Sequence, residues 1–294
     1  MPAPSETYEA VASHDDPPPP PAPATLDLTF TAGGDTWLAL PELDADAMTA
    51  RGPSRMVEDD GVVAVVSPVN VPDASWNGRE LVSDGGCRES LHEFAIIRRV
   101  TGDPSYISEK PVVRWTEQLV ATNGDTVVAA KLSHCNGAFA STGTAMRMAN
   151  RDDALLNERA WDILNKSEFA ANAAREWKAA GEHTSWTHDA VVDTIIATDR
   201  NGVTWVSSHV HTDGIGCGEP SANFWGLFRV RADRSLEQVT LREIDAASLD
   251  AMIDVGGDTP VMLGTALLPS GPLVMAADGS VTASVAPPYF GCPC

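Results

Sequence analysis

The sequence predicts a β-rich α+β fold, with two antiparallel sheet units and a short helical pair between them. Most apolar residues occur in short segments that are rich in β-branched and aromatic residues and bounded by Gly, Pro, Asn or Asp. This pattern is typical of strands in antiparallel sheets. One segment near the middle of the chain instead has the composition of a helix. Either a sandwich or a propeller-like arrangement of the sheet units fits this pattern.

The first 24 residues form a region rich in Pro, Ala, Ser and acidic residues, with an unbroken run of proline at 17–21. Because this region offers almost nothing for a core to bury, we expect a disordered, extended spacer. Such a spacer often separates a folded body from an anchor. We therefore expect that Met1 replaces an upstream signal or lipid-anchor segment, which would tether the natural protein to a surface.

The N-terminal sheet unit is expected over residues 25–150. It opens with LDLTF and TWLAL, which flank TAGGD, and the two glycines predict a hairpin turn at this point. Four further strand candidates of this unit are GVVAVVSP from Gly61, EFAIIRRV from Glu93, VVRW from Val112 and TVVAAKL from Thr126.

Residues 151–181 predict the helical pair. This segment contains no proline, is rich in Ala, Leu, Glu and Arg, and ends at Gly181. Residues 165–167 predict a break, with Ser167 as the N-cap of the second helix. The apolar residues at helical spacing are Leu156, Ala160 and Leu164 in the first helix and Phe169, Ala173 and Trp177 in the second.

The C-terminal sheet unit is expected over residues 182–294. Its strand candidates are DTIIAT from Asp193, TWVSSHVH from Thr204, FWGLFRV from Phe224 and VMLGTALL from Val261.

Two segments of this unit place an acidic turn before an apolar strand. They are VVDTIIATDRNGVTWVSS from Val191 and LDAMIDVGGDTPVMLGTALL from Leu249. The arrangement resembles a degenerate form of the loop-and-strand unit of FG-GAP or VCBS-type repeats. That resemblance implies an extracytoplasmic β-propeller relative in which Asp and Asn of the turn hold calcium. Asx-turn hydrogen bonding is the alternative role for the same residues.

The charge balance excludes some classes of partner. Lys and Arg number 20 and Asp and Glu 41, which gives a net charge of -21. This surface repels nucleic acids and anionic membranes. No stretch of the sequence reaches the roughly 18 apolar residues that a transmembrane helix needs. The acidic excess suits a secreted protein or a high-salt cytoplasm.

Five cysteines lie in loop-like contexts beside Gly, Pro or Asn, where disulfides are common. We expect Cys87 to pair with Cys135 and Cys217 to pair with Cys292, one bridge in each sheet unit. Cys294 would compete with Cys292 for Cys217. The pairings predict an extracytoplasmic protein that is periplasmic, surface-anchored or secreted. Inert thiols in a reducing compartment are the alternative.

His209 and His211 are candidate ligands for a divalent metal, because alternate residues of a strand face the same side. His183 and His188 would add ligands if the fold brought them close. HVHTD resembles the first metal motif of metallo-β-lactamase-like hydrolases, although Gly214 stands where that motif has a further histidine. Two hydrogen-bonded histidines on the solvent face of a strand are the alternative.

The sequence favours a binding or structural protein over an enzyme. It contains neither a Gly-x-Ser-x-Gly nucleophile elbow nor a glycine-rich phosphate loop. The expected function is therefore that of an extracytoplasmic binding or structural protein. The alternative is a metal-dependent hydrolase that uses His209 and His211.

Overall fold

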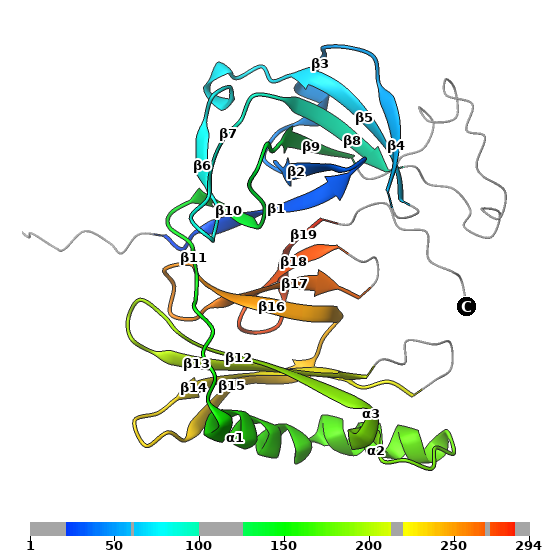
Figure 1. Ribbon diagram of the computed structural model, residues 1–294, viewed down its shortest axis with the longest axis vertical. Helices are drawn as coiled ribbons and strands as arrows, with labels where there is room; N and C mark the ends of the chain where they lie inside the picture. Colours follow the sequence, from blue (N-terminus) through cyan, green and yellow to red (C-terminus); the bar gives the residue numbers. More distant parts are fainter. Residues whose placement is uncertain (1–21, 60–61, 100–125, 213–219, 268–270, 286–294) are drawn as a thin grey trace, which may run out of the picture.

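The computed structural model describes residues 22–59, 62–99, 126–212, 220–267 and 271–285. Within these ranges the protein is strand-rich, with antiparallel sheets stacked in layers and helices on one outer face (Figure 1). The predicted fold class is therefore confirmed. The VVRW strand candidate, Cys217, Cys292, Cys294 and residues 1–21 lie outside the described residues.

The N-terminal part forms an eight-stranded sheet in the order β10-β1-β2-β9-β8-β5-β3, with β4 paired to β5. Gly33 and Gly34 have φ angles of 63° and 74° and make the predicted turn between β1 and β2. The strands are β1 (Thr25–Ala32), β2 (Asp35–Ala39), β3 (Thr49–Ala50), β4 (Arg55–Asp59), β5 (Val62–Asn70), β8 (Phe94–Arg99), β9 (Thr126–Lys131) and β10 (Ala138–Thr142). A separate pair is formed by β6 (Glu80–Val82) and β7 (Arg88–Ser90), and two 3-10 turns cover Ala45–Ala47 and Ala74–Trp76.

The C-terminal part contains two sheets rather than one. The four-stranded sheet is a meander of β12 (Ala190–Thr198), β13 (Thr204–Thr212), β14 (Asn223–Val230) and β15 (Leu236–Glu243). The five-stranded sheet has the order β11 (Met146–Arg147), β16 (Ala246–Asp254), β17 (Val261–Ala266), β18 (Pro272–Met275) and β19 (Val281–Ser284). Strand β11 precedes the helices in sequence, yet it pairs with β16, so the chain joins the C-terminal sheets before it forms the helices.

The predicted helical pair is present as α1 (Ala154–Asn165) and α2 (Glu168–Ala179). Ser167 caps α2 by accepting a hydrogen bond from the Ala170 N–H, as the sequence predicted. A short helix, α3 (Trp186–Asp189), follows. Within the described residues, no helix combines the length and apolar character needed to cross a membrane.

The four-stranded sheet is buried on both faces. Ile196, Val206 and Phe224 pack against the helices, which cover one face of this sheet (Figure 1). Trp205 and Trp225 point the other way, into the core shared with the five-stranded sheet. A further cluster joins the five-stranded sheet to β1 and β10, and its buried members are Leu26, Leu28, Ala138, Ala251, Ile253, Val255 and Val274.

Candidate functional site

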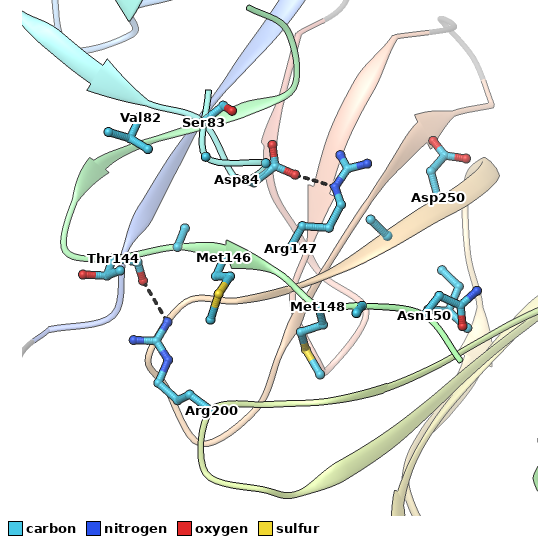
Figure 2. Close-up of a pocket in the computed structure, with 16 residues that line it drawn as sticks. Val82, Ser83, Asp84, Thr144, Met146, Arg147, Met148, Asn150, Arg200 and Asp250 are labelled. Carbon is cyan, nitrogen blue, oxygen red and sulfur yellow. Dashed lines mark hydrogen bonds and ion pairs between the residues drawn. The ribbon is translucent and has the colours of Figure 1, made fainter. Parts of the chain in front are cut away.

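A crevice of about 810 Å³ lies where the N-terminal part meets both C-terminal sheets (Figure 2). Residues 82–86, which begin at the last residue of β6, and residues 144–150, which contain β11, form much of its wall. Ile195 of β12, Arg200 of the next turn, and Asp250 and Ala251 of β16 complete the lining. Four parts of the chain that are distant in sequence therefore meet at one site.

The segment 144–150 is extended because its backbone is held from both sides. The Met148 N–H donates to the Met252 carbonyl oxygen at 2.9 Å, and the Arg147 N–H donates to the Asp84 carbonyl oxygen at 2.9 Å. Extended geometry alternates the side chains, so Met146 and Met148 point to one side and Arg147 to the other (Figure 2). The crevice thus receives flexible apolar groups and a cation from neighbouring positions.

Arg147 is oriented by a buried carboxylate. Its Nε donates to Asp84 Oδ2 at 2.7 Å, and Asp84 Oδ1 accepts the Ala138 N–H at 3.1 Å. Asp84 is buried, whereas the Arg147 side chain is about half exposed. Among the described residues, the terminal guanidinium nitrogens of Arg147 have no hydrogen-bond acceptor. These N–H groups are available to a carboxylate, which a guanidinium binds through two parallel hydrogen bonds.

Arg200 is held in a similar way at another part of the crevice wall. Its Nε donates to Asp254 Oδ2 at 2.8 Å and its Nη2 donates to the Thr144 carbonyl oxygen at 3.2 Å (Figure 2). Burial would raise the pKa of Asp254, but hydrogen bonds from Arg200 and from the Gly256 N–H lower it below its usual value. The Asp254 carboxylate is therefore ionised and bound to a guanidinium.

The resemblance to FG-GAP or VCBS-type repeats led us to expect calcium in two turns. Asp199 begins one of these turns and Asp254 begins the other. Asp199 Oδ1 accepts the N–H groups of Asn201 and Val203, each at 2.9 Å, and Oδ2 accepts Trp205 Nε1–H at 2.9 Å. This is the Asx-turn role that was the alternative. In the structure, Asp199 and Asp254 are thus occupied by donors from the protein itself.

A second cluster of polar side chains lies on the four-stranded sheet. Strand β13 places His209 and His211 on the same face, with ring centroids 5.0 Å apart. His211 Nε2 is 3.0 Å from Asp193 Oδ2 on β12, and His209 Nε2 is 2.7 Å from Asn223 Oδ1 on β14. Potential ligand atoms of Asp193, His209 and His211 all lie within 4.8 Å of one another.

His209 does not lie on a solvent face, which was the alternative expectation for this pair. Its side chain is 1% exposed, because the five-stranded sheet covers this side of β13. Burial lowers the pKa of His209, so the ring is neutral at physiological pH. His183 and His188 are exposed, and among the described residues neither belongs to this cluster.

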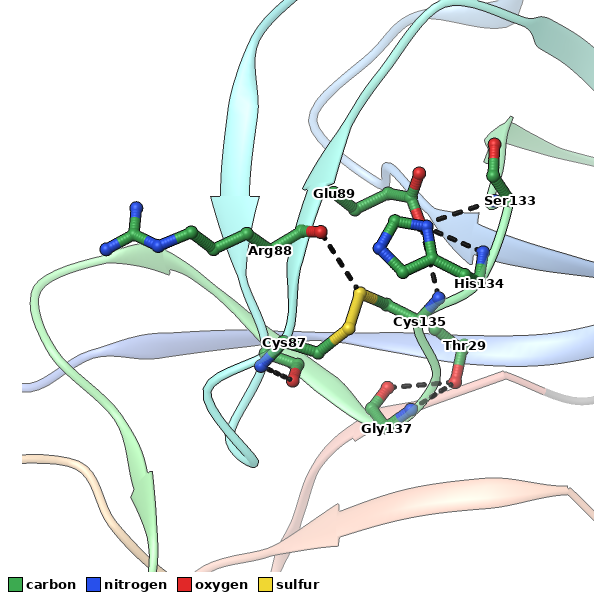
Figure 3. The surroundings of a disulfide bond; sticks show 9 residues. Thr29, Cys87, Arg88, Glu89, Ser133, His134, Cys135 and Gly137 are labelled. Atoms are coloured by element: carbon green, nitrogen blue, oxygen red, sulfur yellow. Dashed lines mark hydrogen bonds and ion pairs between the residues drawn. A yellow bond between two sulfur atoms is a disulfide. The ribbon is translucent and has the colours of Figure 1, made fainter.

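Cys87 and Cys135 form a disulfide, with Cα atoms 5.9 Å apart (Figure 3). Glu89 lies beside it, and one of its carboxylate oxygens accepts the N–H groups of Ser133, His134 and Cys135, each at 3.2 Å. Burial would raise the pKa of Glu89, but these three N–H donors lower it below its usual value. Cys87, His134 and Cys135 lie close enough together to suggest a metal site. The two sulfur atoms are bonded to each other, however, so neither is a free thiolate that could bind a metal, and the role of this group is structural.

Sequence reasoning identified His209 and His211 but missed Asp193 and Asn223. A signal for Asp193 was present, because DTIIAT and TWVSSHVH are separated by a short turn and form a hairpin that pairs Asp193 with His209. Asp84 and Arg147 had no such signal, since they are 63 residues apart and meet only through the tertiary fold.

No family model, curated protein or solved structure matches this chain. Its function must therefore be inferred from the chemistry of these sites.

Proposed function

We propose that this protein is an extracytoplasmic binding protein whose crevice holds an amphipathic ligand with a single carboxylate group. The observation that carries this proposal is the guanidinium of Arg147, which Asp84 holds in a wall that also presents methionines. A cation held by a buried partner loses little freedom when it binds an anion, so such an arrangement favours affinity.

The apolar part of the ligand would lie against Val82 and Met146, which are exposed, while Met148 and Ile195 support this wall from the core. Methionine side chains are flexible and polarisable, so they adapt to apolar ligands of different shape. The volume of about 810 Å³ falls within the range of about 300 to 1,000 Å³ that is usual for small-molecule sites. A ligand with one extended apolar chain fits these features.

Charge in the crevice favours one carboxylate rather than two. Arg200 is neutralised by Asp254, and Arg147 shares its charge with Asp84. Asp250 is exposed, and among the described residues it has no ion-pair partner. A second anionic group on the ligand would therefore be repelled by Asp250 and by the net charge of -21.

The extracytoplasmic location is supported by the disulfide between Cys87 and Cys135. Structural disulfides persist in oxidising compartments and are rare in the cytosol of mesophiles. Thiol alkylation of intact cells before lysis tests the location. The proposal expects both cysteines to be protected from the reagent, and alkylation of Cys87 and Cys135 without prior reduction would contradict it.

Ligand class is tested by titrating the protein with dansyl-undecanoate and competing with decanoate, decanol and decylamine. We expect decanoate to displace the probe at the lowest concentration. Arg147→Gln is expected to weaken binding of the probe about tenfold or more, because it removes a charge-assisted bidentate contact. Arg175→Gln, at an exposed position of α2, is the matched control and should leave affinity unchanged. Equal competition by decylamine, or unchanged affinity of Arg147→Gln, would overturn the proposal.

A further inference from the structure

We propose that Asp193, His209 and His211 form a site for one divalent transition-metal ion of the zinc type. This site is distinct from the carboxylate contact at Arg147. It does not depend on the proposed ligand-binding function, because its residues lie on β12 and β13 and are not required for the crevice contact.

The first argument comes from the hydrogen bonds that determine the tautomer of His209. The Asn223 side chain is oriented by the Ala246 carbonyl oxygen, which accepts from its Nδ2 at 2.9 Å. Its Oδ1 therefore faces His209, and since an amide oxygen can only accept, His209 Nε2 carries the proton and donates it. The lone pair of His209 is consequently on Nδ1. A ring N–H that donates to a carbonyl-type oxygen is the usual second-shell arrangement of a metal-ligating histidine.

The second argument is that this lone pair has no partner in the described structure. His209 Nδ1 is buried and accepts no hydrogen bond from any described residue. A buried polar atom without a partner is costly, so such an atom calls for an explanation. A bound metal ion would satisfy the lone pair.

The third argument is the identity and placement of the donors. Two neutral imidazoles and one carboxylate suit zinc and neighbouring transition metals, whereas calcium and magnesium prefer sites made entirely of oxygen. Two metal–ligand bonds of about 2.1 Å place donor atoms at most about 4.2 Å apart. One ring nitrogen of each histidine and one carboxylate oxygen of Asp193 lie within 4.8 Å of one another, which is close to what coordination needs. Asp193 is exposed and His211 partly exposed, so rotation of these two side chains can close the remaining distance.

Charge around the cluster also favours a cation. The carboxylates of Asp193 and Asp250 both act electrostatically on the His209 ring. Metal binding would replace the hydrogen bond between His211 and Asp193 with two coordinate bonds. Three protein ligands leave a coordination position for water, which the alternative hydrolase function would require.

The test uses untagged full-length protein that has been treated with a chelator and dialysed. Zinc binding is measured by isothermal titration calorimetry, and cobalt(II) is added separately to record its visible absorption. We expect one metal ion per chain and an intense cobalt band typical of four or five ligands. His211→Ala and Asp193→Asn are each expected to lower zinc affinity about tenfold or more. These positions are exposed or partly exposed, so both variants should fold, which circular dichroism will verify.

His188→Ala is the matched control, because His188 also pairs with an aspartate, Asp189, at 3.0 Å. That pair is exposed, and among the residues that the structure describes no second histidine joins it in a ligand cluster, so the control should bind zinc as the wild type does. The proposal would be overturned if no saturable binding of one ion were seen. It would also be overturned if His211→Ala and His188→Ala had the same effect on zinc affinity.

Discussion

Asp84 and Asp254 show what buried carboxylates do in this protein. Each holds the Nε of one arginine, Arg147 or Arg200, at 2.7 to 2.8 Å beside the crevice. A buried ion pair adds little net stability, because desolvation offsets much of the attraction. Its effect here is on orientation, since each arginine loses the freedom of a surface side chain. The position of the crevice cations is therefore determined by two buried carboxylates.

Asp27 on β1 behaves differently and gives a prediction about pH. Burial raises the pKa of Asp27 to about 7 from an ordinary value of 3.8, and the Glu42 carboxylate adds to the shift. Between pH 3.8 and pH 7 the folded protein binds a proton that the unfolded chain has lost. The contribution of Asp27 to the free energy of unfolding therefore decreases as the pH rises through this window and stays constant above it.

Asp27→Asn removes this titration. We expect the variant to gain stability relative to the wild type as the pH rises from 4 to 8, by roughly 2 to 4 kcal/mol in total. Urea unfolding at several pH values measures the difference. Asp73→Asn is the control, because hydrogen bonds from Ser75 lower the pKa of this exposed carboxyl. A difference between Asp27→Asn and the wild type that does not change with pH would contradict the prediction.

At the residue scale, period-two alternation was sufficient to place His209 and His211 on one side of a strand. It could not show that His209 is buried, because burial depends on which sheet covers that side. The covering strand, β16, begins 37 residues after His209 in the chain, at Ala246. Long-range packing of this kind leaves no local signal in the sequence.

At the scale of elements, local chemistry predicted the structures that local interactions stabilise. The β1–β2 hairpin follows from Gly33 and Gly34, and the two helices follow from composition and from the Ser167 cap. Ten strands in the described part of the chain were not predicted. Four of them, β4, β10, β15 and β16, have five to nine residues. The other six, β3, β6, β7, β11, β18 and β19, have two to four residues each, and tertiary pairing determines them. A strand of this length lacks enough residues to show alternation.

Gly264 gives a prediction at this scale. It lies in β17 opposite an irregular part of β16, where a Cβ atom at this position would overlap the Ser248 carbonyl oxygen. Because the obstacle is backbone, it cannot rotate away. We expect Gly264→Ala to lower the free energy of unfolding by about 1 to 3 kcal/mol, as measured by chemical denaturation.

Gly52→Ala is the matched control for this change, because a Cβ at Gly52 meets no atom within 4 Å. Its effect should stay within about 0.5 kcal/mol. If the two alanine variants were equally stable, β16 and β17 would have to be further apart than the structure shows.

At the scale of the whole molecule, the disulfide constrains only the N-terminal part. It closes a loop with a sequence separation of 48 between Cys87 and Cys135. In the chain-entropy model, such a loop stabilises the folded state by about 4 kcal/mol. We expect reduction with dithiothreitol to lower the urea midpoint of the wild type. The Cys87→Ala/Cys135→Ala variant should unfold at the lower midpoint even without dithiothreitol, and a further decrease on reduction would report the expected bridge between Cys217 and Cys292.

The N-terminal and C-terminal parts also share one apolar cluster, and Ile253 on β16 tests whether this makes them a single folding unit. Ile253 is completely buried and belongs to the same cluster as Leu26 and Leu28 of β1. Ile253→Ala would remove apolar contacts from both sides of the junction and leave a cavity, at a cost of roughly 2 to 5 kcal/mol.

Hydrogen exchange followed by mass spectrometry can assign this loss to particular strands. We expect Ile253→Ala to reduce amide protection in β1 as well as in β16, because both strands contribute buried side chains to the same apolar cluster. Leu156→Ala in α1 is the control, since Leu156 packs between the helices and the far face of the four-stranded sheet. It should reduce protection in α1 and leave β1 less affected than Ile253→Ala does. Unchanged protection of β1 in Ile253→Ala would show that the two parts open independently, and the crevice between them would then have no rigid wall.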